Sequence, residues 1–333
     1  MMEIQIRHDE AELRPDRLLR KRFPDVTRDN ALAYLKTGKF LLDGAQVRLA
    51  TRVQAGQLLT LDVSQSKLGI PADASLDVIA HTPHFVVVNK ESGVAMHTGT
   101  GVEDESVTLK GAIAALFPMD ESDDDKRHHH GRAFRGPSFL GRLDRLTSGL
   151  VIAALTWEGL QSIEPAWTDG DVEKAYLLLV HGRAPDEKHI EVPLVSLRER
   201  HKGKGRVEEA RTDIHTLGTA PDGRISLVLA FLHTGRTHQI RRHLKAIGHP
   251  LVADPRYGHK KKDESLRRQN RDPGTLQLHC FRYRFSTSVG DLPLTLQTPI
   301  PERMRRLMQE VGIDLSVVQA AAELTRAPLH ETS

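Results

Sequence analysis

The sequence predicts an α+β protein whose larger domain is built on a mixed, mostly antiparallel sheet. Its apolar and β-branched runs are short, as expected for strands in a sheet interior, and they lie at 85–89, 150–155, 176–180 and 225–231. Helical patterns are fewer, at 106–116, 237–247 and 302–311. Because the helices are interspersed among the strands without strict alternation, the pattern favours α+β.

Length and composition are those of an ordinary globular protein with room for two domains. The chain has 333 residues, of which 39% are hydrophobic and 27% charged. Its single cysteine, Cys280, excludes an intramolecular disulfide and any metal site built from several cysteines. The first ten residues carry charges, and no apolar run approaches the roughly 20 residues of a membrane helix. We therefore expect a cytoplasmic protein without membrane contact, and a monomer.

The chain divides into an N-terminal module (1–63), a linker (64–76), a larger domain (77–315) and a C-terminal tail (316–333). The module combines a helix that starts near Pro15, a second over 28–35 capped by Thr27, and a hairpin turning at Asp43-Gly44. The linker is rich in small residues, Gly and Pro. The tail has helical character but no evident packing partner, and the polar, His-containing stretch 118–137 is expected to be a surface loop.

Basic residues are concentrated in one segment, although the formal net charge of the chain is only +3. Residues 256–271 contain seven basic and two acidic side chains, a net charge of +5. Such a concentration is the electrostatic footprint of a polyanion partner. A solvated loop is the alternative.

The segment 141–150 places a carboxylate, Asp144, between Arg142 and Arg145, just before a Thr-Ser-Gly turn and a strand. A loop fixed by a rigid sheet is a common position for catalytic groups. Neighbouring arginines favour the ionised carboxylate, which suits a nucleophile. A turn aspartate in surface ion pairs is the alternative.

The segment 234–248 predicts a helix capped by Thr237 and stopped by Gly248. His238, Arg241 and Lys245 share one face of it, so a row of cations lies at a helix N-terminus. Phosphate contact or pairing with Asp144 is the functional interpretation, and a solvated amphipathic helix is the alternative.

These segments together resemble the RluA-type pseudouridine synthases. The order Arg-Leu-Asp-x-x-Thr-Ser-Gly-Leu, Glu-Lys-x-Tyr, Thr-Gly-Arg-Thr-His-Gln-Ile-Arg-x-His and Leu-His extends over about 86–299. The first 63 residues resemble the alpha-L RNA-binding domain that a ribosomal protein shares. The sequence departs from the family pattern at Glu91, Gly141, Ala253 and Cys280, none of which is a reacting group.

The resemblance implies a pseudouridine synthase fold and an isomerase that converts uridines of RNA to pseudouridine without a cofactor or a metal. Asp144 matches the nucleophile, Tyr176 the tyrosine that lines the uracil pocket and takes a proton, and Arg241 the basic partner of the aspartate. Arg142 matches the arginine that fills the gap left by the flipped base. The remaining expected substrate contacts are Arg236, His238 and Leu278.

The target base must leave its stack before it can react, which explains why a basic surface accompanies the predicted pocket. Gly99-Thr100-Gly101 lacks the last glycine of a dinucleotide-binding loop, and the histidine run 128–130 is expected to be solvated. We expect ribosomal RNA as the partner, with rRNA processing as the role. The alternatives are the same chemistry on transfer RNA and a non-catalytic RNA-binding or ribosome-assembly factor.

Overall fold

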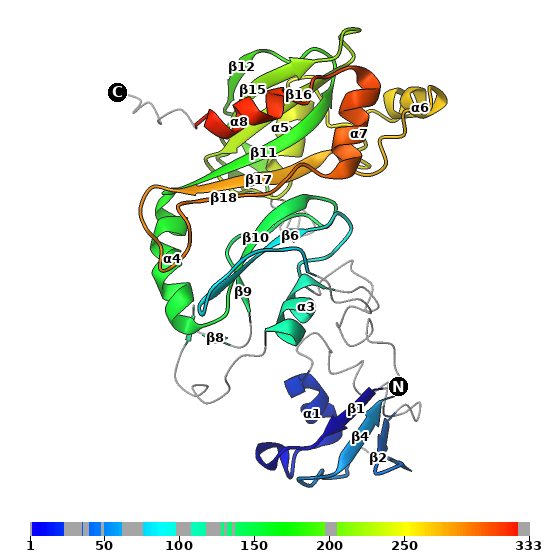
Figure 1. The fold of residues 1–333 in the computed structure, drawn as a ribbon, viewed down its shortest axis with the longest axis vertical. Coiled ribbons are helices and arrows are strands. Elements are labelled where there is room, and N and C mark those ends of the chain that lie inside the picture. The colour runs from blue at the N-terminus through cyan, green and yellow to red at the C-terminus, as the bar shows by residue number, and fades with distance from the viewer. Residues whose placement is uncertain are drawn as a thin grey trace. The chain divides into compact units, whose positions relative to one another are not determined.

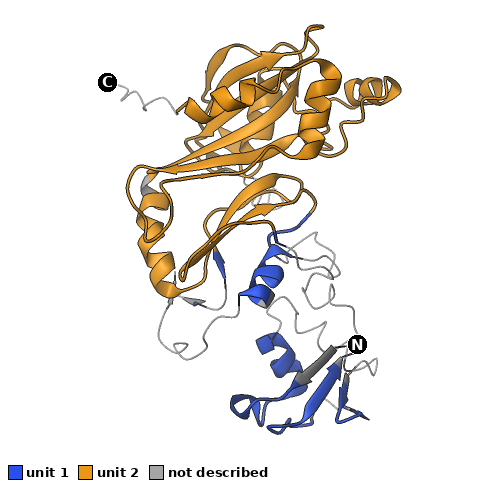
Figure 2. Ribbon diagram, in the orientation of Figure 1, with its two compact units in different colours: residues 1–76, 94–138 blue, residues 77–93, 139–333 orange. Residues whose placement is uncertain are grey.

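A computed structural model describes residues 2–22, 35, 40–47, 50–61, 76–97, 108–117, 128–129, 132–134, 137–196 and 205–325. The chain forms two compact units, one of residues 1–76 and 94–138, the other of 77–93 and 139–333 (Figures 1 and 2). Within the described ranges, no helix is long and apolar enough to cross a membrane.

The first unit contains a four-stranded antiparallel sheet in the order β1-β4-β2-β3. Its strands are β1 (Met2–Gln5), β2 (Phe40–Leu42), β3 (Ala45–Gln46) and β4 (Leu58–Leu61), with a 3₁₀ turn (His8–Glu10) and helix α1 (Pro15–Arg22). The predicted hairpin is confirmed: Asp43 and Gly44 turn with φ of 49° and 80°. The linker 64–75 and nearly all of the second predicted helix lie outside the described residues.

The remainder of this unit contributes α3 (Leu109–Leu116), β7 (His128–His129) and β8 (Arg132–Ala133), the last two paired as a short hairpin. Thr108 caps α3 by accepting a hydrogen bond from the Gly111 amide at 3.2 Å, so the helix begins three residues later than predicted.

The second unit is built on a ten-stranded sheet in the order β12-β15-β16-β11-β17-β10-β6-β5, with β9 on β10 and β18 on β17. Along this order, and for β18 on β17, the pairs are antiparallel except β10 with β17, so the predicted α+β class with a mostly antiparallel mixed sheet is confirmed. The strands are β5 (Val78–His81), β6 (Phe85–Lys90), β9 (Ser138–Phe139), β10 (Ser148–Ala154), β11 (Val172–His181), β12 (Glu187–Ile190), β15 (Thr212–Thr219), β16 (Ile225–Leu232), β17 (Leu278–Phe285) and β18 (Thr295–Gln297). A separate hairpin joins β13 (Leu194–Val195) and β14 (Val207–Glu208).

Helices α7 (Glu302–Val311) and α8 (Val317–Glu323) cover one face of this sheet over β11, β15 and β16 (Figure 1). The expectation that the tail lacks a packing partner is wrong for its described part. Ala321 is fully buried, and the buried Arg282 donates to the carbonyl oxygens of Ala321 and Ala322 at 2.9 and 2.6 Å. An interior guanidinium therefore holds the C-terminal end of α8.

Three further helices are α4 (Trp157–Asp169), α5 (Gln239–Ala246) and α6 (Lys260–Arg268). Helix α4 was not predicted from the sequence; it continues through Pro165 and ends at Gly170 with a left-handed φ of 84°. The stretch 256–271, predicted only as a charged segment, has nine of its residues in α6. The prediction of a helix over 302–311 is confirmed in full.

Candidate active site

Asp144 lies on the loop that leads into β10, and a close backbone approach fixes that loop. Gly149 pairs with Cys280 of β17, and a Cβ at Gly149 would lie 2.1 Å from the Cys280 carbonyl oxygen. Only glycine permits this approach at a φ of 114°. The Thr147 amide also donates to the Asp144 carbonyl oxygen at 3.0 Å, closing a tight turn. The carboxylate is therefore anchored from the backbone, with its side chain 26% exposed.

Arg241 of α5 contacts this carboxylate directly. Its Nη1 donates to Asp144 Oδ2 at 2.9 Å, across 97 residues of sequence. The Arg241 side chain is only 5% exposed, so the protein shields the arginine end of this ion pair from water. The structure thus brings together the two residues that the sequence predicts as nucleophile and basic partner.

Asp254 is a site residue that the sequence patterns did not indicate. Both of its oxygens accept hydrogen bonds from Arg241, from Nε at 2.7 Å and from Nη2 at 2.8 Å, and its side chain is fully buried. The Arg256 and Tyr257 amides donate to the same carboxylate at 2.9 and 3.0 Å. Burial alone would raise the pKa of Asp254, but the hydrogen bonds from Arg241 and the backbone amides outweigh it and lower the pKa. The carboxylate therefore stays ionised and orients the guanidinium.

His238 faces the other oxygen of Asp144. Its Nε2 lies 3.6 Å from Asp144 Oδ1, and its Nδ1 is 3.1 Å from the Tyr257 hydroxyl. Burial, which outweighs the attraction of Asp144, lowers the pKa of His238, so the ring is neutral at pH 7. The expected cap at Thr237 is wrong. His238 itself occupies the N-cap position, with a φ of 56°. The Gln239 side-chain oxygen accepts a hydrogen bond from the Arg236 amide at this end of the helix.

Tyr176 and Leu278 are buried on neighbouring strands of the sheet, and the charge of Asp144 acts on Tyr176. Tyr176 is 7% exposed in β11 and pairs with Cys280 of β17, while Leu278 is 4% exposed at the start of β17. Burial raises the pKa of Tyr176 well above its usual range, and Cys280 and the negative charge of Asp144 raise it further. The hydroxyl therefore keeps its proton at neutral pH.

Lys90 is a second site residue that the sequence patterns did not indicate. It is 2% exposed, and its Nζ donates to the carbonyl oxygens of Glu91 and Arg145 at 2.8 and 3.1 Å. Burial lowers its pKa to about 7, against the opposing attraction of Asp144. Arg145 follows Asp144 directly in the chain, so this hydrogen bond from Lys90 anchors the loop that carries Asp144.

Two predicted substrate contacts lie outside this cluster. Arg142 is exposed two residues before Asp144, on the same loop. Arg236 instead donates from Nε to the Glu209 carbonyl oxygen at 3.0 Å and lies 3.6 Å from the Glu208 carboxylate. The structure therefore leaves Arg142 accessible and binds Arg236 to the β14 segment.

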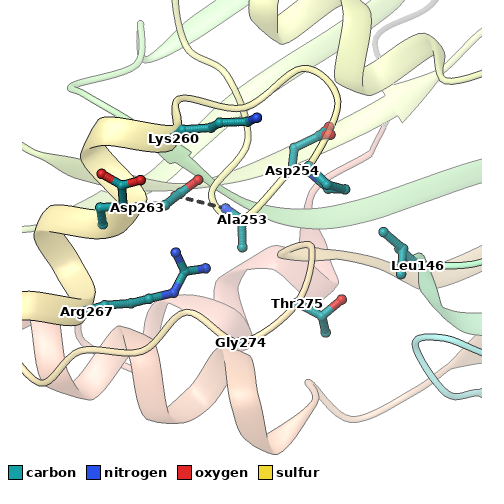
Figure 3. A pocket seen from close by; sticks show the side chains of 10 residues that line it. Leu146, Ala253, Asp254, Lys260, Asp263, Arg267, Gly274 and Thr275 are labelled. Atoms are coloured by element: carbon teal, nitrogen blue, oxygen red, sulfur yellow. Dashed lines mark hydrogen bonds between the residues drawn. The ribbon is translucent and has the colours of Figure 1, made fainter.

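A pocket of about 440 Å³ opens beside the carboxylate cluster. Leu146 and Asp254 line one part of it, and Lys260 and Arg267 of α6 line another. Figure 3 shows the Arg267 guanidinium pointing into this pocket. The basic helix thus shares a cavity with residues that adjoin Asp144.

Comparison with known proteins decides which family this arrangement represents. The family model for RNA pseudouridylate synthases matches residues 84–246. A protein of Chloroflexus aurantiacus named as an uncharacterised RNA pseudouridine synthase is 32% identical over 85% of this chain and 88% of its own length. The chain belongs to the RNA pseudouridylate synthase family.

Other relatives of the synthase agree. The large-subunit ribosomal pseudouridine synthase D of Xanthomonas campestris pv. campestris is 29% identical over 93% of this chain and 92% of its own length. The solved structure of human RNA pseudouridylate synthase domain containing 1 is 25% identical, with a TM-score of 0.55 over 78% of this chain and 99% of that chain. The expected isomerase activity on RNA and the RluA-type resemblance are confirmed.

The geometry fits the isomerisation that this synthase family performs. The reaction breaks the bond between the ribose and a ring nitrogen and forms a bond to ring carbon 5. The proton on that carbon is released, and the freed ring nitrogen takes up a proton. A glycosidase would need two carboxyl groups on opposite sides of the bond. Here only one carboxylate, Asp144, is partly exposed, and the second, Asp254, is fully buried and paired with Arg241.

Proposed function

We propose that Asp144 is the nucleophile of this synthase and that large-subunit ribosomal RNA is its substrate. The observation that carries the first part is the line Asp254–Arg241–Asp144, in which a buried carboxylate orients the guanidinium that holds the reacting one. The ion pair fixes the position of the Asp144 carboxylate, while its side chain remains 26% exposed to an incoming nucleotide.

Each of the other side chains would make a different contact with a flipped uridine. Tyr176 and Leu278 supply an apolar wall, and the neutral Tyr176 hydroxyl can form a hydrogen bond with the uracil. The neutral His238 borders the opposite oxygen of Asp144. The exposed Arg142 would fill the gap in the RNA stack.

RNA would approach over α6. Five exposed cations lie on this helix, namely Lys260, Lys261, Lys262, Arg267 and Arg268. Its buried Asp263 accepts a hydrogen bond from the Ala253 amide at 3.1 Å and lies 2.8 Å from His181 Nε2, which ties the helix to the segment that carries Asp254. Cations so placed would contact phosphates close to the reacting nucleotide, which positions RNA without reading its sequence.

The module over 1–63 would add affinity. On α1 the side chains of Arg17 and Arg20 are exposed, whereas Arg14 is paired with Asp16 at 2.7 Å and Lys21 with Asp9 at 2.6 Å. We assign phosphate contact to Arg17 and Arg20 on this basis. Arg28, another basic residue of this module, lies outside the described residues.

The ribosomal substrate is supported by the names of two relatives, the large-subunit ribosomal pseudouridine synthases of Xanthomonas campestris pv. campestris and Vibrio vulnificus. The latter is 27% identical over 92% of this chain and 96% of its own length. We further propose that the synthase works in the cytoplasm as a monomer. Transfer RNA is the alternative substrate.

The test offers the synthase two unmodified transcripts, large-subunit ribosomal RNA and pooled transfer RNA, both labelled with tritium at uracil carbon 5. Tritium release reports isomerisation, and mapping locates the product. We expect release from ribosomal RNA at defined positions. Release from transfer RNA alone would overturn the substrate proposal while leaving Asp144 untouched.

A further inference from the structure

Two histidines and an aspartate meet at the far edge of the large sheet. In the strand register, His189 of β12 faces Asp213 of β15, which in turn faces Phe231 of β16. His233 lies two residues beyond Phe231 and therefore on the same face of the sheet. Pairing of three neighbouring strands thus places these side chains together, although 24 and 20 residues separate them along the chain.

Their ligand-forming atoms converge. His233 Nε2 lies 2.6 Å from Asp213 Oδ2, His189 Nδ1 contacts Asp213 Oδ1, and the three ligand atoms all lie within 4.8 Å of one another. The side chains of Asp213 and His233 are 10% and 4% exposed, and that of His189 is 49% exposed. One end of the cluster is therefore rigid and interior, while the other opens to solvent.

Each histidine of the cluster can turn a nitrogen lone pair toward Asp213. His189 Nε2 is 3.0 Å from Glu191 Oε1, so the neutral ring with its proton on Nε2 directs the Nδ1 lone pair at the Asp213 carboxylate. Nothing in the described part of the chain hydrogen-bonds the buried His233 Nδ1, so His233 can likewise present a lone pair from Nε2. The spacing of these atoms is that of hydrogen bonds, so a metal ion would replace the shared protons, and the ligand atoms would move slightly apart.

We propose that His189 Nδ1, His233 Nε2 and Asp213 bind a structural zinc ion, with water as the fourth ligand. Two imidazoles and a carboxylate suit zinc as a ligand set. A histidine ligand that donates its other N–H to a carboxylate, as His189 does to Glu191, is the usual outer-shell arrangement.

Strand pairing shows why this zinc would be structural. Phe231 faces Ala175 of β11, whereas the next residue, Tyr176, faces the other side of the sheet, toward Asp144. The cluster and the candidate active site therefore occupy opposite faces. Strand β12 ends the sheet and pairs only with β15 in the strand order. A zinc ion would fasten this edge strand to β15 and to the end of β16.

Zinc binds imidazoles only in their deprotonated form, so protons should compete with the metal at this cluster.

The experiment uses the full chain without a histidine tag, stripped of metal and titrated with zinc chloride at about pH 7.5. We expect one zinc ion to bind through this cluster and to raise the melting temperature. Both effects should be lost in His189→Ala. Because the His189 side chain is half-exposed, this variant should still fold. His215→Ala is the matched control, because His215 lies on the same face of β15 but pairs with Glu187 at 3.3 Å. A variant with alanine at 128–130 removes incidental binding by the histidine run.

The outcomes separate clearly. Zinc binding that survives in His189→Ala, or disappears with residues 128–130, would overturn the proposal. So would an unchanged melting temperature with zinc, since the cluster would then be a hydrogen-bonded ion pair only. Pseudouridine formation should be equal in the metal-free and zinc-loaded protein, and loss of activity on zinc removal would contradict the structural role.

Discussion

Arg241 donates two hydrogen bonds to Asp254, and this leaves a single guanidinium edge for Asp144. The side chain of Asp254 is fully buried and that of Arg241 is 5% exposed. Burying an arginine without a fixed partner is costly, and a guanidinium bound at two atoms cannot rotate freely. The position of the Asp144 carboxylate therefore depends on Asp254, a buried residue that contacts it only through Arg241.

Asp254→Asn should lower the rate of isomerisation by roughly 10²-fold while RNA affinity stays close to that of the wild type. Asparagine keeps the shape but loses one acceptor for Arg241, so the guanidinium no longer fixes Asp144. Single-turnover rates and filter binding measure the two effects separately. Glu10→Gln is the matched control, because this buried carboxylate also accepts two hydrogen bonds from an arginine, Arg22, but belongs to the first unit. Equal rate losses in both variants would show that Asp254 acts only on stability.

Tyr176→Phe should slow the chemical step by roughly 10²-fold with little change in RNA affinity, because the ring stays and only the hydroxyl is removed. Burial raises the pKa of Tyr176 above its usual range, so its phenol is protonated throughout about pH 7–9. The wild-type single-turnover rate should therefore be flat over this range. A rate that climbs about tenfold per pH unit, and no longer does so in Tyr176→Phe, would instead identify a phenolate base.

Replacing Lys260, Lys261 and Lys262 together with alanine should weaken RNA binding and reduce its salt dependence. For single-stranded RNA, the slope of the logarithmic salt plot should fall by roughly 0.7 for every phosphate that the variant no longer neutralises. Lys188→Ala combined with Arg224→Ala removes exposed cations from elsewhere on the sheet as a control. An unchanged salt slope in the α6 variant would place the RNA away from this helix.

Arg17→Ala combined with Arg20→Ala should likewise raise the dissociation constant and flatten the salt slope, but leave the modified uridine unchanged. Both side chains are exposed on α1 and do not take part in the ion pairs that hold Arg14 and Lys21, so stability should not suffer. Melting curves check that point, and pseudouridine mapping checks the target. Modification of a different uridine would mean that selectivity resides in this module.

Sequence patterns predicted the features that depend on neighbouring residues and missed those that depend on contacts between residues far apart in the chain. The strands around Val87, Ile152 and Leu178 and the helix over 302–311 follow from apolar periodicity, and the Asp144–Arg241 pair follows from the family motifs. The site role of Asp254 was not predicted, because an aspartate in a short loop shows its partner only once α5 packs against it.

Long-range packing explains the two other features that the sequence did not reveal. The cluster at His189, Asp213 and His233 escaped because only the β12-β15-β16 register unites residues so far apart. The contact that holds α8 was not predicted because its partner, Arg282, lies 39 residues before Ala321, in a strand that the sequence patterns did not indicate.

Asp144→Asn tests the central claim most directly. The amide has nearly the same shape, can still accept from Arg241 Nη1, and cannot act as a nucleophile. Tritium release from carbon 5 of the target uridine should fall by a factor on the order of 10⁴ or more, with RNA affinity and melting temperature close to those of the wild type. Substantial pseudouridine formation by this folded, RNA-binding variant would contradict the assignment of Asp144 as the nucleophile.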